Sequence, residues 1–218
     1  MNNPSVHRAP LSRMRAKLYV VAAPSGGGKT SLINALLDKD DRVRLSVSYT
    51  TRTARPGEKD GVHYHFIDDQ DFIGLIGKNA FLEHAEVFGH RYGTGRNAVE
   101  KKLAAGFDVL LDIDWQGARQ IRKSCPSCCT IFVLPPSLEA LRNRLARRGQ
   151  DCEDVIEKRM REARAEIAHS SEFDYLIIND DFDQALADLQ SIVRHRKLYR
   201  PAPKGHYDDL LAELQENG

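Results

Sequence analysis

The chain has 218 residues and a formal net charge of +1, with 41% of its residues hydrophobic and 29% charged. These values are ordinary for a globular enzyme, and the length favours one domain with insertions over two independent domains. A net charge this close to zero gives no global basic field that would attract nucleic acid or an anionic membrane.

The N-terminal stretch, residues 1–16, carries arginines but no apolar segment, so it does not have the pattern of a secretory signal. We expect these residues to form a disordered tail. No apolar run in the chain approaches the ~20 residues that cross a bilayer. Together these features favour a cytoplasmic protein.

The first predicted element is a buried strand at residues 17–23 (KLYVVAA), an apolar run that ends at Pro and Gly. Residues 29–38 place leucine and isoleucine side chains on one stripe, which predicts a helix. A glycine-rich loop joins the two, and its residues are Ala23, Pro24, Ser25, Gly26, Gly27, Gly28, Lys29 and Thr30.

This loop, residues 23–30, has the strand-before and helix-after context that a P-loop requires. Its glycines let backbone N–H groups point inward at phosphate oxygens, and the helix adds the positive end of its dipole. Lys29 can bridge the β- and γ-phosphates of a nucleotide, and the Thr30 hydroxyl can ligate Mg²⁺. The usual first glycine is Ala23 here, a mild departure at negative φ and a serious one at positive φ. A glycine-rich turn that binds nothing is the disfavoured alternative.

Residues 46–96 differ in composition from the rest of the chain, because they are richer in Gly, Tyr, His and charged residues and hold only short runs of alternating polar and apolar residues. This pattern predicts an inserted substrate-binding subdomain. Its first part combines hydroxyls with arginines, which suits a terminal phosphate, since each guanidinium can bind two oxygens. The residues concerned are Ser48, Arg52, Arg55 and Tyr64.

Further along the insert come Glu83, Tyr92 and Thr94. A carboxylate can accept hydrogen bonds from both N1–H and the exocyclic amine of guanine, a pair that adenine does not offer. Taken singly, each charged side chain of the insert would more often be a solvated surface group. Their joint presence after a P-loop favours a second nucleotide site.

The next apolar run, residues 108–114 (DVLLDID), predicts a strand that becomes acidic at its C-terminal end. There Asp112 and Asp114 alternate onto one face, at the edge of an open α/β sheet where ligands bind. Burying two carboxylates is costly unless Mg²⁺, water or the donors of a base meet them. A pair of helix-capping or salt-bridged aspartates is the alternative.

The rest of the chain repeats the strand-then-helix pattern. Buried strands are predicted at residues 130–134 and 175–179, and a helix at residues 137–148 with Ser137 as its N-cap. Residues 146–154 predict a mobile loop, and the last helix is expected to end near Tyr199. Alternating apolar strands and helices predict an α/β fold with a parallel sheet covered on both faces.

Three of the four cysteines are crowded together, at Cys125, Cys128 and Cys129. They do not resemble a disulfide framework. The C-x-x-C step has the spacing of half a zinc site, but no second pair follows. Reduced structural thiols are the favoured interpretation.

The loop at 23–30 and the strings SYTTRTARPGE, FLEHAEVFGHRYGT, LLDIDWQGA, RGQD and NDD together resemble a bacterial guanylate kinase, from about Lys17 to Arg196. The resemblance implies a P-loop NTPase fold with a core (17–45, 97–139 and 155–196), a GMP-binding insert (46–96) and a lid (140–154). Residues 197–218 would be a tail with a short amphipathic helix. The implied activity is transfer of the γ-phosphate of ATP to GMP in purine metabolism, with Mg²⁺ accompanying ATP. No nucleic-acid or membrane partner is implied, and a homo-oligomer stays open.

The resemblance also implies individual roles. The GMP phosphate would be held by Ser48, Arg52, Arg55 and Tyr64, and the guanine by Glu83, Thr94 and Asp114, with Asp112 and Tyr92 in support. Serine is the commoner residue at the position of Thr94. ATP would be held by residues 23–30, Arg144, Arg148 and Asn179, and the metal by Thr30 and Asp114, directly or through water. The catalytic set would be Lys29, Arg52, Arg144, Arg148 and Arg159.

Two other classes stay open at this stage. Some relatives of this fold are interaction modules without kinase activity, but these characteristically have degraded P-loops, whereas GGGKT is intact here. A P-loop kinase acting on another phosphorylated acceptor is the second, and Glu83, Tyr92 and Thr94 favour guanine over it. A regulatory GTPase is disfavoured because the sequence has no N-K-x-D string.

Overall fold

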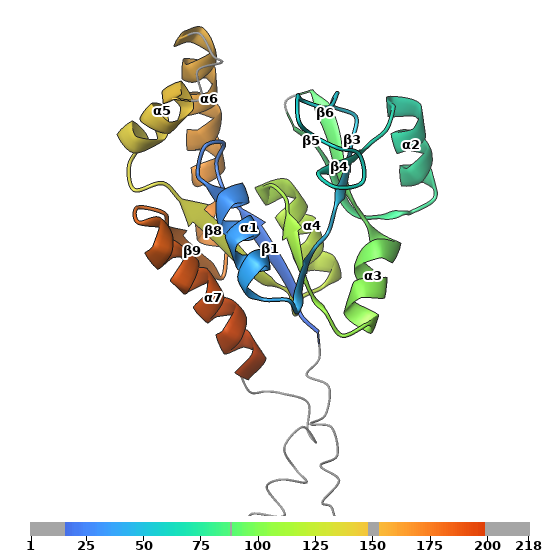
Figure 1. Cartoon of the computed structure of the whole chain (residues 1–218). Coiled ribbons are helices and arrows are strands. Elements are labelled where there is room, and N and C mark those ends of the chain that lie inside the picture. Colours follow the sequence, from blue (N-terminus) through green and yellow to red (C-terminus); the bar gives the residue numbers. More distant parts are fainter. Residues whose placement is uncertain (1–15, 88, 148–152, 199–218) are drawn as a thin grey trace, which may run out of the picture.

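The computed structural model describes residues 16–87, 89–147 and 153–198 (Figure 1). Several predictions concern positions outside these ranges: the N-terminal tail, Arg148, most of the loop at 146–154, and most of the C-terminal tail.

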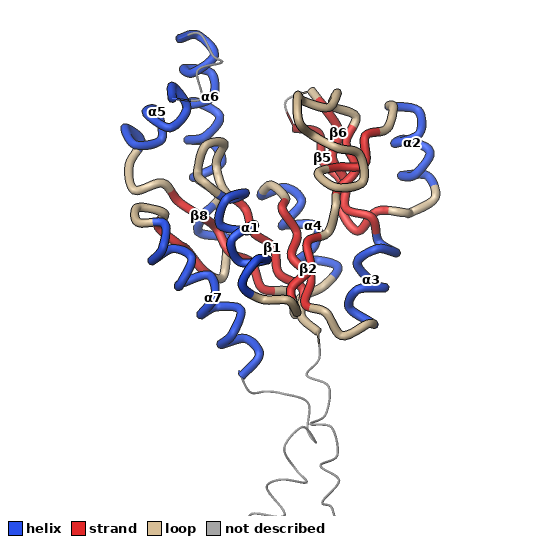
Figure 2. Tube along the Cα trace, in the orientation of Figure 1, coloured by secondary structure: helices blue, strands red, loops and turns tan. Residues whose placement is uncertain are grey.

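A five-stranded sheet forms the centre of the fold, and Figure 2 shows its strands side by side. In spatial order its strands are β2 (Val43–Leu45), β7 (Asp108–Asp112), β1 (Leu18–Ala22), β8 (Cys129–Leu134) and β9 (Tyr175–Ile178). Every pairing is parallel. The α/β fold with a parallel sheet is therefore confirmed, and the four predicted strands are present with ends that differ by one or two residues.

Helices cover both faces of this sheet (Figure 1). Alternate residues of β1 point to opposite faces, so Tyr19 and Val21 join one apolar cluster and Leu18 and Val20 join another. The first cluster includes side chains of α1 (Lys29–Lys39) and α7 (Phe182–Leu198), and the second includes side chains of α3 (Arg96–Ala104) and α4 (Trp115–Ser124). Since both faces are dry, β1 is buried along its whole length.

A second, four-stranded sheet is built from the chain between β2 and α3. Its spatial order is β4 (Tyr64–Phe66), β3 (Ser48–Thr50), β6 (His90–Gly95) and β5 (Phe81–Val87), and α2 (Asp69–Gly77) packs beside it. The Gln120 side chain of α4 donates to the His84 carbonyl of β5 at 2.8 Å and accepts from the His84 N–H at 3.2 Å. This pair of bonds ties the second sheet to the core.

Two further helices stand on the other side of the core's upper edge, α5 (Leu138–Arg147) and α6 (Glu153–Ile167) (Figure 1). They pack on each other through one apolar cluster, made of Leu141, Leu145, Ile156, Met160 and Ala163. The predicted cap of α5 is confirmed, since the Ser137 hydroxyl accepts from the Ala140 N–H at 3.0 Å. A short 3₁₀ turn, η1 (Ser170–Glu172), leads from α6 to β9.

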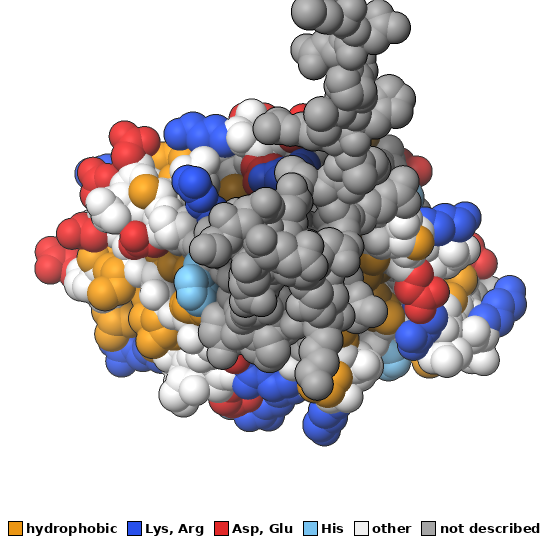
Figure 3. Space-filling view, turned by 90° about the horizontal axis from the view of Figure 1, so that it is seen from below, with side chains coloured by type: hydrophobic (Ala, Val, Ile, Leu, Met, Phe, Trp, Pro, Cys, Tyr) orange, Lys and Arg blue, Asp and Glu red, His pale blue; other side chains and the backbone are white. Residues whose placement is uncertain are grey.

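In the described ranges, no helix combines the length and the apolar character needed to cross a membrane. Figure 3 shows the molecule from below, and basic, acidic and hydrophobic side chains are interspersed on the coloured part of this face. Of the three crowded cysteines, Cys128 and Cys129 are buried and Cys125 is partly exposed.

Candidate active site

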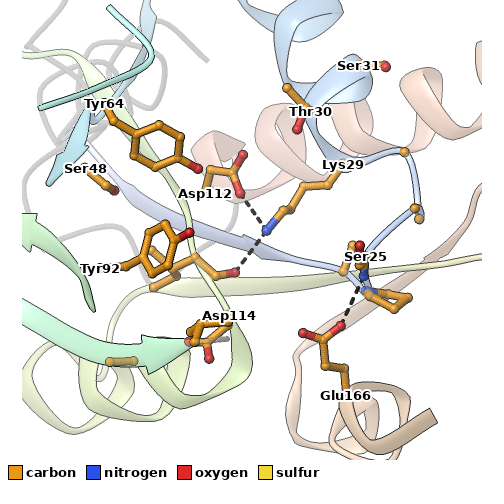
Figure 4. Close-up of a pocket in the computed structure, with 18 of the residues that line it drawn as sticks. Ser25, Lys29, Thr30, Ser31, Ser48, Tyr64, Tyr92, Asp112, Asp114 and Glu166 are labelled. Carbon is orange, nitrogen blue, oxygen red and sulfur yellow. Dashed lines mark hydrogen bonds and ion pairs between the residues drawn. The ribbon is translucent and has the colours of Figure 1, made fainter. Parts of the chain in front are cut away.

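A cavity of about 280 Å³ opens between the C-terminal edge of the five-stranded sheet and the second sheet. It is lined by residues 23–31, by the end of β7, by the inner side of the second sheet and by one side chain of α6 (Figure 4). The predicted site residues that line it outside the loop at 23–30 are Ser48, Arg55, Tyr64, Glu83, Tyr92, Asp112 and Asp114. The structure therefore brings the predicted P-loop and most of the residues predicted to bind GMP into one cavity.

The loop at 23–30 has the geometry of an anion-binding loop. Gly26 and Gly28 have φ of 86° and 92°, values that L side chains rarely adopt, and α1 begins directly after Gly28. Ala23 does not have positive φ, because Asn79 is the only non-glycine residue with positive φ among those described. Alanine in place of the usual glycine is therefore a mild departure. The N-terminus of α1 thus lies at the cavity, where the positive end of the helix dipole would meet an incoming anion.

Lys29 points from α1 across the cavity to the end of β7 (Figure 4). Its ammonium lies 2.6 Å from Asp112 Oδ1 and donates to the Ile113 carbonyl at 3.3 Å. Both side chains keep about a fifth to a quarter of their surface exposed, at 20% and 25%. Asp112 is therefore salt-bridged to the cation that a nucleotide phosphate would need.

Asp114 corrects one expectation. We expected it on the strand beside Asp112, but β7 ends at Asp112 and Asp114 is the N-cap of α4. Its Oδ1 accepts from the Gly117 N–H at 2.9 Å, and its Oδ2 accepts from the Gln116 amide at 3.0 Å. The alternation expected from the strand is wrong, because a carboxylate is also the preferred residue for starting the helix that follows. Asp114 still lines the cavity.

Glu83 is the most deeply buried acid of the cavity, with 3% of its surface exposed. Its Oε1 accepts from the Thr94 hydroxyl at 2.5 Å, and Thr94 is fully buried. Burial raises the pKa of Glu83 to about 7, against the opposing effect of the Thr94 bond, and the nearby charge of Asp114 adds to the rise. A carboxyl held this way is stabilised as an anion only when further N–H donors reach it.

Gly117 is a site residue that the sequence did not single out. A Cβ at this position would lie 2.6 Å from Glu83 Oε2 and 3.2 Å from Ile113 Cδ1. The first turn of α4 can therefore approach β5 only because residue 117 has no side chain. That approach places Glu83 beside Asp114.

The residues predicted to bind the GMP phosphate lie partly in the cavity and partly behind it. Arg55 and Tyr64 line the cavity, whereas Arg52 does not. The Arg52 guanidinium donates to Glu58 Oε1 at 2.9 Å and to the Thr53 carbonyl at 2.7 Å. Glu58, which the sequence did not single out, also accepts from the Arg55 N–H at 2.7 Å. One carboxylate thus organises both arginines of the turn.

Charge and burial fix the protonation of two groups here. Arg52 holds the pKa of Glu58 below its usual value, so this acid is ionised. Burial, with the charge of Asp112 adding to it, raises the pKa of Tyr64 to about 12. Tyr64 therefore presents a neutral hydroxyl to the cavity as a donor.

The residues predicted on the ATP side lie behind the loop. The Asn179 amide donates to the Gly27 carbonyl at 2.9 Å, and Arg144 donates to the Asn179 carbonyl at 2.7 Å. A side chain on Gly28 would collide with the Asn179 amide. Arg144, Arg159 and Asn179 do not line the cavity. In this structure Asn179 supports the loop's backbone, and its contact with adenine stays a prediction.

Glu166 is a second residue that the sequence did not single out. It lies near the end of α6, lines the cavity, and accepts from the Ser25 N–H at 3.1 Å (Figure 4). Burial raises its pKa to about 7, opposed by the Ser25 bond and by the charge of Lys29. The one sequence signal that could have pointed to Glu166 is its place one turn after the buried residues of α6, which are Ile156, Met160 and Ala163.

Comparison with known proteins agrees with this geometry. The family model described as guanylate kinase matches residues 15–196. The guanylate kinase of Alkalilimnicola ehrlichii is 59% identical over 203 residues, covering 92% of this chain and 97% of its own. The guanylate kinase of Vibrio cholerae is 55% identical over 202 residues, covering 92% and 98%. A crystal structure of guanylate kinase from Anaplasma phagocytophilum superposes with a TM-score of 0.74 at 34% identity, covering 94% of this chain and 95% of that one.

Proposed function

The chain belongs to the guanylate kinase family, a family of ATP:GMP phosphotransferases, and from this premise we propose how its cavity divides between two nucleotides. Its activity is phosphoryl transfer from ATP to GMP. The observation that carries the division is that one cavity joins a P-loop to a buried, protonatable carboxyl on the second sheet. ATP binds at the first end and GMP at the second.

The guanine binds against Glu83. This carboxyl accepts from the Thr94 hydroxyl, and its burial makes ionisation unfavourable unless more donors arrive. Guanine brings two adjacent donors, N1–H and the exocyclic amine, which one carboxylate can accept together. Asp114, whose oxygens hold the first turn of α4, lies next to this position and completes the base site.

The GMP phosphate binds against the turn that follows β3. Ser48, Arg55 and Tyr64 supply hydroxyl and guanidinium donors directly to the cavity. Arg52 is held by Glu58 with its guanidinium 5.5 Å from the centre of the Tyr64 ring. A small rotation of this side chain would add a second forked donor, and two guanidinium groups would neutralise a phosphate dianion.

The ATP phosphates bind in the loop at 23–30. Lys29 exchanges its bond with Asp112 for phosphate oxygens, and Thr30 and Asp114 supply the oxygen ligands that Mg²⁺ prefers, with Asp114 acting directly or through water. These two residues would hold Mg²⁺, and the chemistry it would supply is neutralisation of the charge on the donor phosphates. The cavity residues fit this ion, since a hydroxyl and two carboxylates face the same space.

The chemistry asks the protein mainly to hold two anions in line. The acceptor oxygen is already negatively charged near neutral pH, so positioning and charge neutralisation carry the reaction. Arg144 is proposed to bind the donor phosphates. In support, its Nη1 is buried without a hydrogen-bond partner among the described residues, so this donor is available for an oxygen of ATP. Arg148, in the proposed lid at residues 140–154, is expected to join Arg144 when the lid closes over ATP, and Arg159 on the next helix, α6, is expected to act with both. The interpretation of the crowded cysteines as reduced structural thiols agrees with the cytoplasmic location that we propose.

Arg55→Ala tests the acceptor end of this division, with Arg91→Ala as a matched control. Arg91 is another arginine of the insert at 46–96, on β6, but its Nε is paired with Asp69 Oδ1 at 2.7 Å and it does not line the cavity. Loss of a charged hydrogen bond costs about 1.5–3 kcal/mol, so Arg55→Ala should raise KM for GMP roughly 10- to 150-fold. KM for ATP should stay within about twofold. Equal GMP kinetics in both variants would remove Arg55 from the acceptor site.

A further inference from the structure

Glu166 has no part in the binding of the two nucleotides proposed above, yet it makes a direct hydrogen bond between α6 and the loop at 23–30. Its carboxylate accepts from the backbone N–H of Ser25 at 3.1 Å, across 141 residues of sequence. Figure 4 shows this side chain rising from α6 toward Ser25, on the side of the view opposite Tyr64 and Ser48. It is a partly buried acid placed on a loop that is shaped to bind anions.

The neighbouring helix makes a second contact with the same loop. A Cβ on Gly26 would lie 3.0 Å from side-chain carbons of both Leu141 and Leu145, so α5 packs directly against the glycine. The same two leucines form the apolar cluster that joins α5 to α6. The two helices therefore touch the loop as one unit, through apolar side chains from α5 and one carboxylate from α6.

Backbone N–H groups of such a loop bind the oxygens of phosphates. One N–H that is directed at a carboxylate oxygen is not free for a phosphate oxygen, and two anions cannot share it without strong repulsion. The surrounding charges make this competition sharper. Lys29, whose charge acts on Glu166, has its ammonium 2.6 Å from Asp112 Oδ1, and Asp114 and Glu162 add negative charge.

We propose that Glu166 is a positioning residue that competes with the donor triphosphate for the loop, so that ATP binds only after its carboxylate has left the Ser25 N–H. This inference rests on the proposed ATP site at residues 23–30. Glu166 then acts as an internal anion: it holds the loop and α6 together, and it lowers the affinity for the donor. The competitor is displaced by the charge of the polyphosphate chain, and adenine plays no part in that step.

Glu166→Gln separates this competition from simple structural support. Glutamine keeps the size of the side chain and an oxygen that can accept from Ser25, but it removes the negative charge. A charge removed within about 6 Å in a partly buried site changes the affinity for a polyanion on the order of 5- to 30-fold. We therefore expect inorganic tripolyphosphate to bind the variant roughly 10-fold more tightly at pH 8. AMP, which has no β- or γ-phosphate, should bind both proteins equally.

The matched control is Glu162→Gln, one turn earlier on α6, which removes the same charge without a bond to the loop. Glu162 lies 4.0 Å from Lys158, at the limit of an ion pair. Binding of tripolyphosphate, AMP and GMP is measured by calorimetry for the wild type and both variants. The proposal predicts tighter tripolyphosphate binding in Glu166→Gln alone, together with a lower KM for ATP and an unchanged KM for GMP.

Two results would overturn the proposal. Tripolyphosphate affinity within twofold of wild type in a folded Glu166→Gln protein would show that the carboxylate supports structure only. An equal gain in Glu162→Gln would show a general charge effect. If Glu166→Gln does not fold, Glu166→Ala in the same comparison must show the same gain or the proposal fails. A wild type that binds neither ATP nor tripolyphosphate would instead refute the proposed ATP site itself, which keeps the two failures distinct.

Discussion

Glu83→Gln is the most informative substitution, because it changes one buried acceptor and very little shape. In the wild type, Glu83 Oε1 is bonded to the Thr94 hydroxyl at 2.5 Å, and only 3% of the residue is exposed. Glutamine can keep the Thr94 bond with its oxygen. Its NH₂ group then faces the N–H donors of guanine, so one hydrogen bond is lost and two donors oppose each other in a dry site.

The structure sets the size of this effect. Raising the pKa of Glu83 from 4.5 to about 7 corresponds to about 3 kcal/mol of unfavourable ionisation, which the guanine donors must offset. Removing such a charge-assisted pair and leaving a donor unpaired costs about 2–4 kcal/mol. We therefore expect kcat/KM for GMP to fall roughly 30- to 1,000-fold. Part of this loss should appear in kcat if guanine binding drives closure of the site.

The assay is steady-state ADP release with GMP and with IMP, which lacks the exocyclic amine. The wild type should prefer GMP strongly, and Glu83→Gln should lose most of that preference while KM for ATP is unchanged. Glu86→Gln is the matched control, since Glu86 lies on the same strand but is exposed, 3.8 Å from Arg91. Wild-type GMP kinetics in a folded Glu83→Gln protein would refute the guanine site and leave the P-loop assignment intact.

Three further predictions follow from the same contacts. Lys29→Ala should keep the fold, as judged by circular dichroism, and lower kcat on the order of 10²-fold or more, because no backbone group replaces its charge; near wild-type turnover would contradict this. Gly117→Ala should raise KM for GMP about 10-fold, because the new Cβ would lie 2.6 Å from Glu83 Oε2, although alanine by itself favours a helix by about 1 kcal/mol. Between pH 5 and 8 the wild type should lose up to about 3 kcal/mol of unfolding free energy relative to Glu83→Gln. The pKa of Glu83 is about 7 in the folded state and 4.5 in the unfolded state, so its stabilising contribution is complete below pH 4.5 and is lost as the pH rises through 7. Parallel curves of unfolding free energy against pH for the two proteins, measured by denaturant titration, would be evidence against it.

The core of the fold could be predicted because its signals are local. The run at residues 17–23 is apolar throughout, and the strand it forms is buried on both faces. The GGGKT string sits where a strand meets a helix, and Ser137 has a helix-capping side chain at a helix start. Each of these depends on residues within one turn or one strand, so the sequence alone carries it.

One error is local, at the end of β7, and the omissions concern contacts between distant segments. Residues 108–114 alternate as a strand would to their end, yet the chain leaves the sheet at Asp112 because Asp114 caps α4. Glu166 meets Ser25 across 141 residues, and Gly117 is required only because Glu83 of another element approaches it. No pattern in the sequence around these residues distinguishes them from an ordinary helical acid or a helical glycine.

The central claim is that this chain moves a phosphoryl group from ATP to GMP and selects the acceptor by its guanine. Its most direct test is a coupled assay of ADP release in which the full chain, ATP and Mg²⁺ are held constant and GMP, AMP, CMP or UMP is supplied in turn. We expect rapid ADP release with GMP and at least about 10²-fold lower kcat/KM with each of the others, because a buried acceptor such as Glu83 would then be left without its donors. Comparable turnover with AMP, CMP or UMP, or no turnover with GMP, would contradict it.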